Sequence, residues 1–109
     1  GETVADTARV RGLICLSYPF HPPGKPEKLR TEHLADLRTP TLILQGERDP
    51  FGTHDEVGGY ALSPAIEVVF LPDGDHSFKP RKASGHTEDG NIEEAVVRMD
   101  RFLKDIAAA

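Results

Sequence analysis

Three short apolar runs, each ending in a polar loop, set the pattern of the chain. They cover residues 13–16, 40–46 and 67–71 and are rich in leucine and β-branched residues. Each run is unbroken rather than alternating, which is typical of strands whose two faces are both covered by helices. The pattern therefore predicts three buried β-strands.

The segments between these runs favour short helices. Residues 31–37 allow two helical turns, with Leu34 and Leu37 on one face, before Pro40 ends them. Residues 53–56 read Thr-His-Asp-Glu. This is the pattern of a capping box, in which the threonine and the glutamate satisfy two free backbone amides at the start of a helix. We expect one helix in each connection.

The last part of the chain carries the clearest helical pattern. Apolar residues recur there at intervals of three and four and predict a helix whose apolar face covers the sheet: Ile92, Ala95, Val96, Met99, Phe102, Leu103 and Ile106. Asn91 and Glu94 have the spacing of a helix cap, and the polar residues 79–90 before them predict a loop. At the other end, residues 1–10 have the spacing of a helix that Gly12 ends.

The order of these elements predicts the fold class. After an initial helix fragment, it is β-α-β-α-β-α. Crossovers between strands of one sheet are right-handed in nearly all proteins, which makes the three strands parallel and adjacent. With 109 residues in all, we expect residues 1–109 to form a single α/β domain or part of one.

Composition excludes several classes of partner. The net charge of −5 does not favour nucleic acid or an anionic membrane surface. No apolar run approaches the ~18 residues that span a bilayer, and no signal-peptide pattern occurs. The one cysteine, Cys15, lies in an apolar run and has no partner for an internal disulfide. It is typical of a small buried hydrophobe, and we expect a reducing, cytoplasmic setting.

Two residues suited to acid–base chemistry follow the second and third runs. Asp49 comes shortly after the second run, and His76 follows the third, 27 positions further on. The carboxyl ends of adjacent parallel strands lie at the same edge of a sheet, where ligands bind in open α/β folds. Histidine can accept and return a proton near neutral pH, and an anion on its other ring nitrogen fixes the tautomer. The flexible Gly74 allows the histidine loop to turn towards Asp49.

Other readings of these two residues stay open at this stage. Asp49 precedes Pro50 and is also suited to starting a turn. His76 also fits an exposed loop histidine. Asp75 is a second potential partner for His76, although adjacent side chains rarely reach each other well.

Metal and cofactor motifs are missing from the sequence. The remaining histidines have no metal-binding spacing, and residues 73–78 lack the glycine that a calcium loop requires at its sixth position. No glycine-rich phosphate loop occurs. We therefore predict no metal and no cofactor. Lys79, Arg81 and Lys82 form a small basic cluster that suits either a solvated loop or an acidic substrate group.

Three stretches resemble a known family, the α/β-hydrolases. Pro-Thr-Leu-Ile-Leu-Gln-Gly-Glu-Arg-Asp-Pro-Phe (residues 40–51) resembles the acid strand of that fold, and Leu-Pro-Asp-Gly-Asp-His-Ser-Phe (residues 71–78) its histidine loop. Tyr-Pro-Phe-His-Pro-Pro-Gly-Lys-Pro (residues 18–26) resembles small bacterial hydrolases related to the dienelactone hydrolases. The resemblance implies the C-terminal half of a doubly wound hydrolase sheet, with the acid and the base of a Ser-Asp-His triad.

The same resemblance implies positions for the substrate. The proline-rich loop after the first strand leaves the sheet at the active-site face in this family. Phe20 and His21 of this loop, together with Phe51 after the second run, are expected to contact a small-molecule substrate. A rigid connector is the simpler role for Phe20 and His21 when each is taken singly.

One departure from the family pattern shapes the functional expectation. The sequence has no Gly-x-Ser-x-Gly nucleophile elbow, and Ser17 lies between Leu16 and Tyr18, whereas an elbow needs small neighbours. We expect the chain to supply the acid and the base of an ester or acyl hydrolase whose serine lies elsewhere. Its partner would be the N-terminal half of the fold or a second copy of the chain. The alternative is a non-catalytic module, or a degenerate hydrolase fragment, that acts through assembly.

Overall fold

The computed structural model describes residues 11–25, 27 and 32–108. Its strands are β1 (Leu13–Leu16), β2 (Thr41–Gly46) and β3 (Ile66–Leu71). The described residues also form two α-helices, α2 (His54–Val57) and α3 (Glu88–Ala108), and two short 3₁₀ helices, η1 (Glu32–Ala35) and η2 (Lys82–Ser84). The helix expected over residues 1–10 lies outside the described part.

The three strands form one parallel sheet in the order β1-β2-β3. This confirms the predicted α/β class and strand arrangement. In the register, Cys15 of β1 lies beside Ile43 of β2, which lies beside Val68 of β3. All three strands therefore end at the same edge of the sheet, and the loops that follow β2 and β3 are neighbours.

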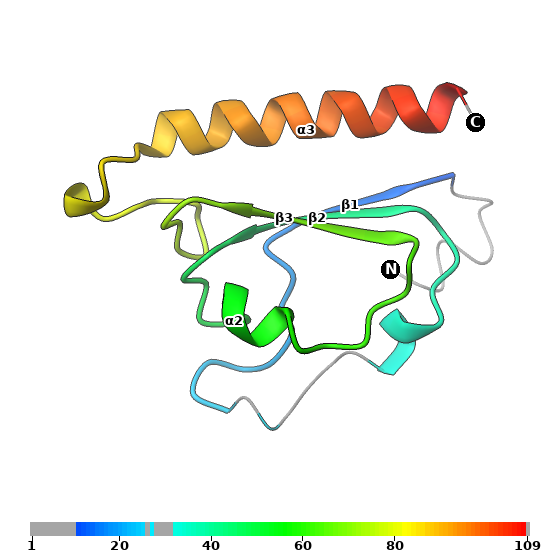
Figure 1. Cartoon of the computed structure of the whole chain (residues 1–109), viewed down its shortest axis with the longest axis horizontal. Coiled ribbons are helices and arrows are strands. Elements are labelled where there is room, and N and C mark those ends of the chain that lie inside the picture. Colours follow the sequence, from blue (N-terminus) through cyan, green and yellow to red (C-terminus); the bar gives the residue numbers. More distant parts are fainter. Residues whose placement is uncertain (1–10, 26, 28–31, 109) are drawn as a thin grey trace.

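The sheet is covered on both faces, which explains why the apolar runs are unbroken. Alternate residues of β2 belong to two separate clusters, because successive side chains of a strand point to opposite faces. Ile43 packs with Phe20, Leu34 and Val57 on one side. Leu42 and Leu44 pack on the other side with Leu71 of β3 and Ala95 of α3. Figure 1 shows α3 running along one face of the sheet, with α2 on the other.

The short helices differ from the prediction in length. The expected two turns over residues 31–37 are a single 3₁₀ turn, η1. The capping box before α2 is present as predicted: Thr53 Oγ1 accepts the N–H of Glu56, and Glu56 accepts the N–H of Thr53. However, α2 ends after one turn, because Gly58 and Gly59 follow and glycine is a poor helix former.

The long helix α3 begins three residues before the predicted cap. Thr87 Oγ1 accepts the N–H of Gly90 at 3.0 Å. Asn91 instead lies inside the fold, where its amide donates to the carbonyls of Pro72 and Phe78. The loop expected over residues 79–90 therefore contains η2 and the first turn of α3.

Part of the apolar stripe on α3 does not face the sheet. Ala95 is buried, and Met99 and Phe102 pack against the same cluster as predicted. The prediction was wrong for three members of the stripe, which are exposed: Ile92, Val96 and Leu103. The described sheet has three strands, and it is too narrow to cover the full width of the stripe.

Candidate active site

Asp49 and His76 meet at the carboxyl edge of the sheet. His76 Nδ1 lies 2.9 Å from Asp49 Oδ2. The aspartate is fully buried, whereas 46% of the histidine side chain is exposed. The predicted geometry of two neighbouring strands delivering an acid and a histidine to one place is therefore confirmed. The catalytic role of the pair stays a prediction.

The turn after β2 holds Asp49 in place. Its N–H donates to the carbonyl of Gly46 at 3.1 Å, and its carbonyl accepts the N–H of Gly52 at 3.0 Å. Asp49 Oδ1 accepts the N–H of Phe51 at 2.9 Å. The sequence left two roles open for Asp49, and the carboxylate has both of them: Oδ1 closes a turn, and Oδ2 contacts His76.

The histidine loop approaches β2 closely at Gly46. A Cβ atom at this position would collide with the main-chain oxygens of Asp75 and Gly74. The glycine at the end of the second run is therefore needed for contact between the two loops. Arg48 N also donates to Gly74 O at 2.9 Å, which fixes the loops to each other.

Asp75 does not compete with Asp49 for His76. Its Oδ1 accepts the N–H groups of Ser77 at 2.8 Å and Lys79 at 3.0 Å. Burial is the largest single influence on this side chain and opposes its ionisation. The hydrogen bonds from the backbone of Lys79 and Ser77, together with the nearby charges of Arg48 and Lys79, nevertheless hold the pKa of Asp75 below its usual value. Asp75 therefore shapes the loop and leaves His76 to Asp49.

Asp73 joins the histidine loop to its surroundings. Arg81 Nη2 lies 2.6 Å from Asp73 Oδ1, and Arg81 N donates to Oδ2 at 2.7 Å. Arg48 Nε lies 3.3 Å from Asp73 Oδ1. Hydrogen bonds from Arg81 hold the pKa of Asp73 well below its usual range. All three residues of the basic cluster noted in the sequence are exposed, and Arg81 is paired with Asp73.

Geometry decides which nitrogen of His76 is available for chemistry. Asp49 is an acceptor, so Nδ1 carries the hydrogen and the neutral ring presents a lone pair at Nε2. Within the described ranges, no residue hydrogen-bonds Nε2. This is the arrangement that a general base requires.

The three predicted substrate-binding residues lie in different environments. The ring of Phe51 lies 4.6 Å from the ring of His76, centroid to centroid, and is half-buried, so it forms a wall beside the imidazole. Phe20 and His21 are almost fully buried. A substrate contact by either of them would require this packing to open, and their substrate-binding role stays untested.

Two residues next to the site, Gln45 and Ser17, have supporting roles that the sequence pattern did not predict. Gln45 is fully buried at the end of β2, and its side chain binds main-chain groups of Tyr18 and Gly52. Its position as a polar residue within an apolar run was the one signal in the sequence for this supporting role. Ser17 has a left-handed backbone (φ +65°), and its Oγ donates to the main-chain oxygen of His76 at 2.6 Å. It contacts the histidine loop and not the imidazole.

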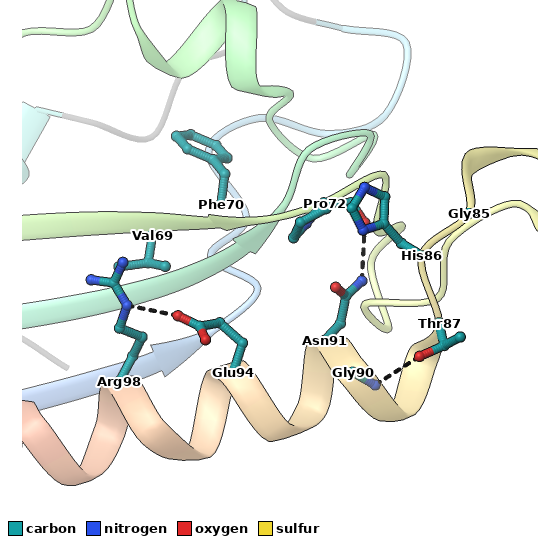
Figure 2. Close-up of a pocket in the computed structure, with 10 residues that line it drawn as sticks. All are labelled: Val69, Phe70, Pro72, Gly85, His86, Thr87, Gly90, Asn91, Glu94 and Arg98. Carbon is teal, nitrogen blue, oxygen red and sulfur yellow. Dashed lines mark hydrogen bonds and ion pairs between the residues drawn. The ribbon is translucent and has the colours of Figure 1, made fainter.

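A cavity of about 470 Å³ lies away from this pair, between the edge of β3 and α3. Figure 2 shows its walls, with Phe70 and Pro72 on one side and Glu94 and Arg98 on the other. Neither Asp49 nor His76 lines it. Arg98 Nε donates to Glu94 Oε1 at 2.9 Å, so the charges on this wall neutralise each other. The cavity is therefore distinct from the candidate active site.

Comparison with known protein families identifies the family of this chain. Residues 1–104 match a family described as an alpha/beta hydrolase domain. The chain belongs to this family. No solved structure matches the hydrolase domain. In the described part of the domain, no group of three or more histidine, cysteine or acidic side chains is placed to hold a metal ion, and no helix is long and apolar enough to cross a membrane.

Proposed function

We propose that this alpha/beta hydrolase domain supplies the acid and the base of a Ser-Asp-His triad that hydrolyses esters or related acyl compounds of small molecules. Asp49 is the acid and His76 is the base. The observation that supports the proposal is the 2.9 Å contact between Asp49 Oδ2 and His76 Nδ1, which leaves Nε2 accessible. Within the hydrolase family, we propose that the chain is related to the dienelactone hydrolases.

The proposed chemistry uses each nitrogen of the imidazole once. Nε2 takes the proton of a serine hydroxyl as the oxygen attacks the acyl carbon, and then gives it to the leaving group. The Asp49 carboxylate stabilises the imidazolium that forms between these steps. The full burial of Asp49 strengthens the attraction, because a carboxylate removed from water is screened less than an exposed one.

The described serines near His76 are poor nucleophiles. Ser17 Oγ is bound to the main-chain oxygen of His76. Ser77 lies between His76 and Phe78, so it lacks the small neighbours of an elbow. We therefore assign the nucleophile to a strand outside the described sheet.

Among the described strands, β1 has a neighbour on one side only, and its outer edge is the proposed place for that strand. Leu13 N donates to Pro40 O and Ser17 N to Leu44 O, both towards β2. Because the direction of backbone groups alternates along a strand, those of Ile14 and Leu16 point to the other side. A strand from the N-terminal half of the fold, or from a second copy of this chain, would pair there and carry the serine towards His76.

A non-catalytic assembly module is the second candidate. It is favoured by the exposed apolar side chains near the same edge, which suit association whether or not chemistry follows: Leu16, Ile92, Val96 and Leu103.

For either candidate we propose the cytoplasm as the compartment. The one cysteine, Cys15, is compatible with that setting. Burial raises the pKa of its thiol, which keeps it protonated and less reactive.

Hydrolysis of a simple activated ester tests the proposal. We expect the chain alone to show no turnover above a His76→Ala variant. Combined with an N-terminal segment that carries Gly-x-Ser-x-Gly, it should show saturable turnover that needs His76 and is blocked by a serine-directed reagent. No turnover in the combined protein would favour the assembly module. Turnover by the chain alone that a serine reagent blocks would mean that it holds a nucleophile, which Ser17→Ala and Ser77→Ala variants would locate.

A further inference from the structure

We propose that the ion pair between the buried His21 and the partly exposed Glu56 is a latch that holds residues 18–25, here called the proline loop, against the turn that carries Asp49, and thereby positions the Asp49–His76 pair. The inference rests on the proposed function only for the catalytic meaning of that pair. His21 and Glu56 are positioning residues, because neither contacts the imidazole of His76.

The proline loop is anchored to the Asp49 turn by main-chain contacts. His21 N donates to Phe51 O at 3.0 Å. The buried amide of Gln45 bridges the two segments, since it donates to Tyr18 O and to Gly52 O, both at 3.1 Å. Residues far apart in sequence are thereby joined at the end of β2.

Packing reinforces this anchor at a single glycine. Phe20 is fully buried and lies directly on Gly52. A Cβ atom at Gly52 would be 2.6 Å from Phe20 Cδ2, closer than such atoms approach in proteins. The loop and the turn therefore fit together without space between them.

The imidazole of His21 is held at both nitrogens. Nδ1 lies 2.8 Å from the carbonyl oxygen of Pro22, and Nε2 lies 3.0 Å from Glu56 Oε1, while the residue is 3% exposed. A carbonyl and a carboxylate are both acceptors, and a neutral imidazole has one N–H. Only the imidazolium donates to both, so the contacts describe a buried cation paired with an anion.

Glu56 extends the latch to the start of α2. The same Oε1 accepts the N–H of Thr53 at 3.0 Å and lies 3.2 Å from Thr53 Oγ1. The hydrogen bond from Thr53 N, and then that from His21, lower the pKa of Glu56. The carboxylate therefore stays ionised and caps α2 while it holds the loop.

Phe51 carries the effect of the latch to the catalytic pair. Its carbonyl accepts the N–H of His21, its own N–H donates to Asp49 Oδ1, and its ring lies against the ring of His76. A shift of the proline loop thus moves a residue that contacts both Asp49 and His76. The path is one of direct contacts, without a gap.

The latch depends on pH in a defined sense. The hydrogen bond to Pro22 O, assisted by Glu56, raises the pKa of His21 although burial opposes the rise. Among the described residues, the charged groups that act on the ring are Glu56 of α2 and Glu27 beyond the proline loop. A raised pKa in the folded state means that the stabilisation is complete below the ordinary value of about 6.5 and is lost as the pH rises through the raised value.

Nuclear magnetic resonance of the whole protein tests the latch without needing turnover. The readouts are the amide signal of Phe51 and the resonance of the His76 Nδ1 proton, followed against pH. In the unaltered protein, we expect one transition of both signals to follow the titration of His21. Glu56→Gln retains a side chain that can complete the capping box. It should move this transition to lower pH by about one unit, as the loss of a neighbouring opposite charge does.

His21→Gln should abolish this transition, whereas His54→Gln, at an exposed ring, should leave it unchanged. If the Phe51 and His76 signals are indifferent to the titration of His21, or respond alike in Glu56→Gln and in the unaltered protein, the latch is refuted. If His21→Gln does not fold, the shift of the transition in Glu56→Gln is the deciding test of the latch. A protein that shows this coupling but never hydrolyses an ester would refute the proposed function alone.

Discussion

Asp49 and His76 are joined by one oxygen of a buried carboxylate, while the other oxygen closes the turn that presents it. Oδ2 lies 2.9 Å from His76 Nδ1, and Oδ1 accepts the N–H of Phe51 at the same distance. Position and tautomer of the histidine are therefore set by a group that is itself fixed at both oxygens. Because both oxygens of Asp49 are engaged in this way, a short loop can hold the half-exposed ring of His76.

Replacing the acid by its amide should disable the base with little change of shape. In Asp49→Asn, the side chain can turn an N–H towards His76, which favours the wrong tautomer. We expect the esterase activity of the complete hydrolase to fall by about 10⁴, the loss typical of this exchange in a serine triad. Asp55→Asn, at a fully exposed carboxylate, is the matched control. Full activity in Asp49→Asn would remove Asp49 from the mechanism.

The close contact at Gly46 predicts an unusual sensitivity to a single methyl group. Gly46→Ala would push the histidine loop away from β2, because backbone atoms of Gly74 and Asp75 occupy the space of the new Cβ. We expect a loss of about 1–3 kcal/mol in the free energy of unfolding, together with loss of the His76 Nδ1 proton resonance.

Gly58→Ala is the control for this substitution. Gly58 has a helical backbone, and a Cβ there meets ordinary contacts at 3.5 Å. Alanine should therefore be neutral or stabilise by roughly 0.4–1 kcal/mol. Equal effects of the two substitutions in denaturant titrations would contradict the tight fit at Gly46.

Strand placement could be predicted because it depends on local pattern. The runs around Ile43 and Val68 are unbroken, so burial on both faces follows, and right-handed crossovers then fix a parallel order. With both loops at one edge, the meeting of Asp49 and His76 follows as well. The ends of the helices were less predictable, because Thr87 and Asn91 are both plausible caps and tertiary hydrogen bonds of Asn91 decide between them.

Support for the site could not be predicted from the pattern. Ser17 and His76 are 59 positions apart, and His21 and Glu56 are 35 apart. Neither pairing leaves a periodic signal, since each depends on how the loops pack after the sheet has formed. For the same reason His21 was expected at a substrate pocket, whereas the structure buries it with both ring nitrogens bound.

The Asp73–Arg81 contact predicts how the histidine loop responds to acid. A carboxyl whose pKa is lower in the folded state stabilises the protein above its unfolded value, about 3.9, and this stabilisation is lost as the pH falls through the lower folded value. Asp73→Asn should therefore melt at a lower temperature than the unaltered protein near neutral pH. The difference should persist to about pH 4 and shrink below it.

Asp36→Asn, at an exposed residue, is the control for acid sensitivity. Thermal melts monitored by circular dichroism between acidic and neutral pH provide the measurement. A melting difference for Asp73→Asn that is constant over the whole range would show that the contact contributes through shape and not through charge.

The last prediction concerns assembly through the open edge of β1. Glu94 and Arg98 of α3 line the cavity at the β3 edge. With 100° between successive helical residues, Ile92, Val96 and Leu103 lie on the opposite flank of the helix, towards β1.

Leu16 belongs to the same patch. It lies two positions after Ile14, which packs in the α3-side cluster, so its side chain points to that face of the sheet, where 58% of it is exposed. No charge lies within Leu13–Leu16 to discourage pairing along the edge, and Pro19 comes too late to block it.

Burial of this patch is worth about 25 cal/mol per Å² before the costs of association. We therefore expect the chain to dimerise, or to pair with a chain that carries the N-terminal half of the fold, at micromolar concentration in light scattering. Val96→Glu should weaken this association, whereas Val97→Glu should leave it intact, because Val97 is equally exposed but points away from the sheet. A compact monomer whose cooperative melt does not depend on concentration would contradict the prediction and leave the β1 edge without a partner strand.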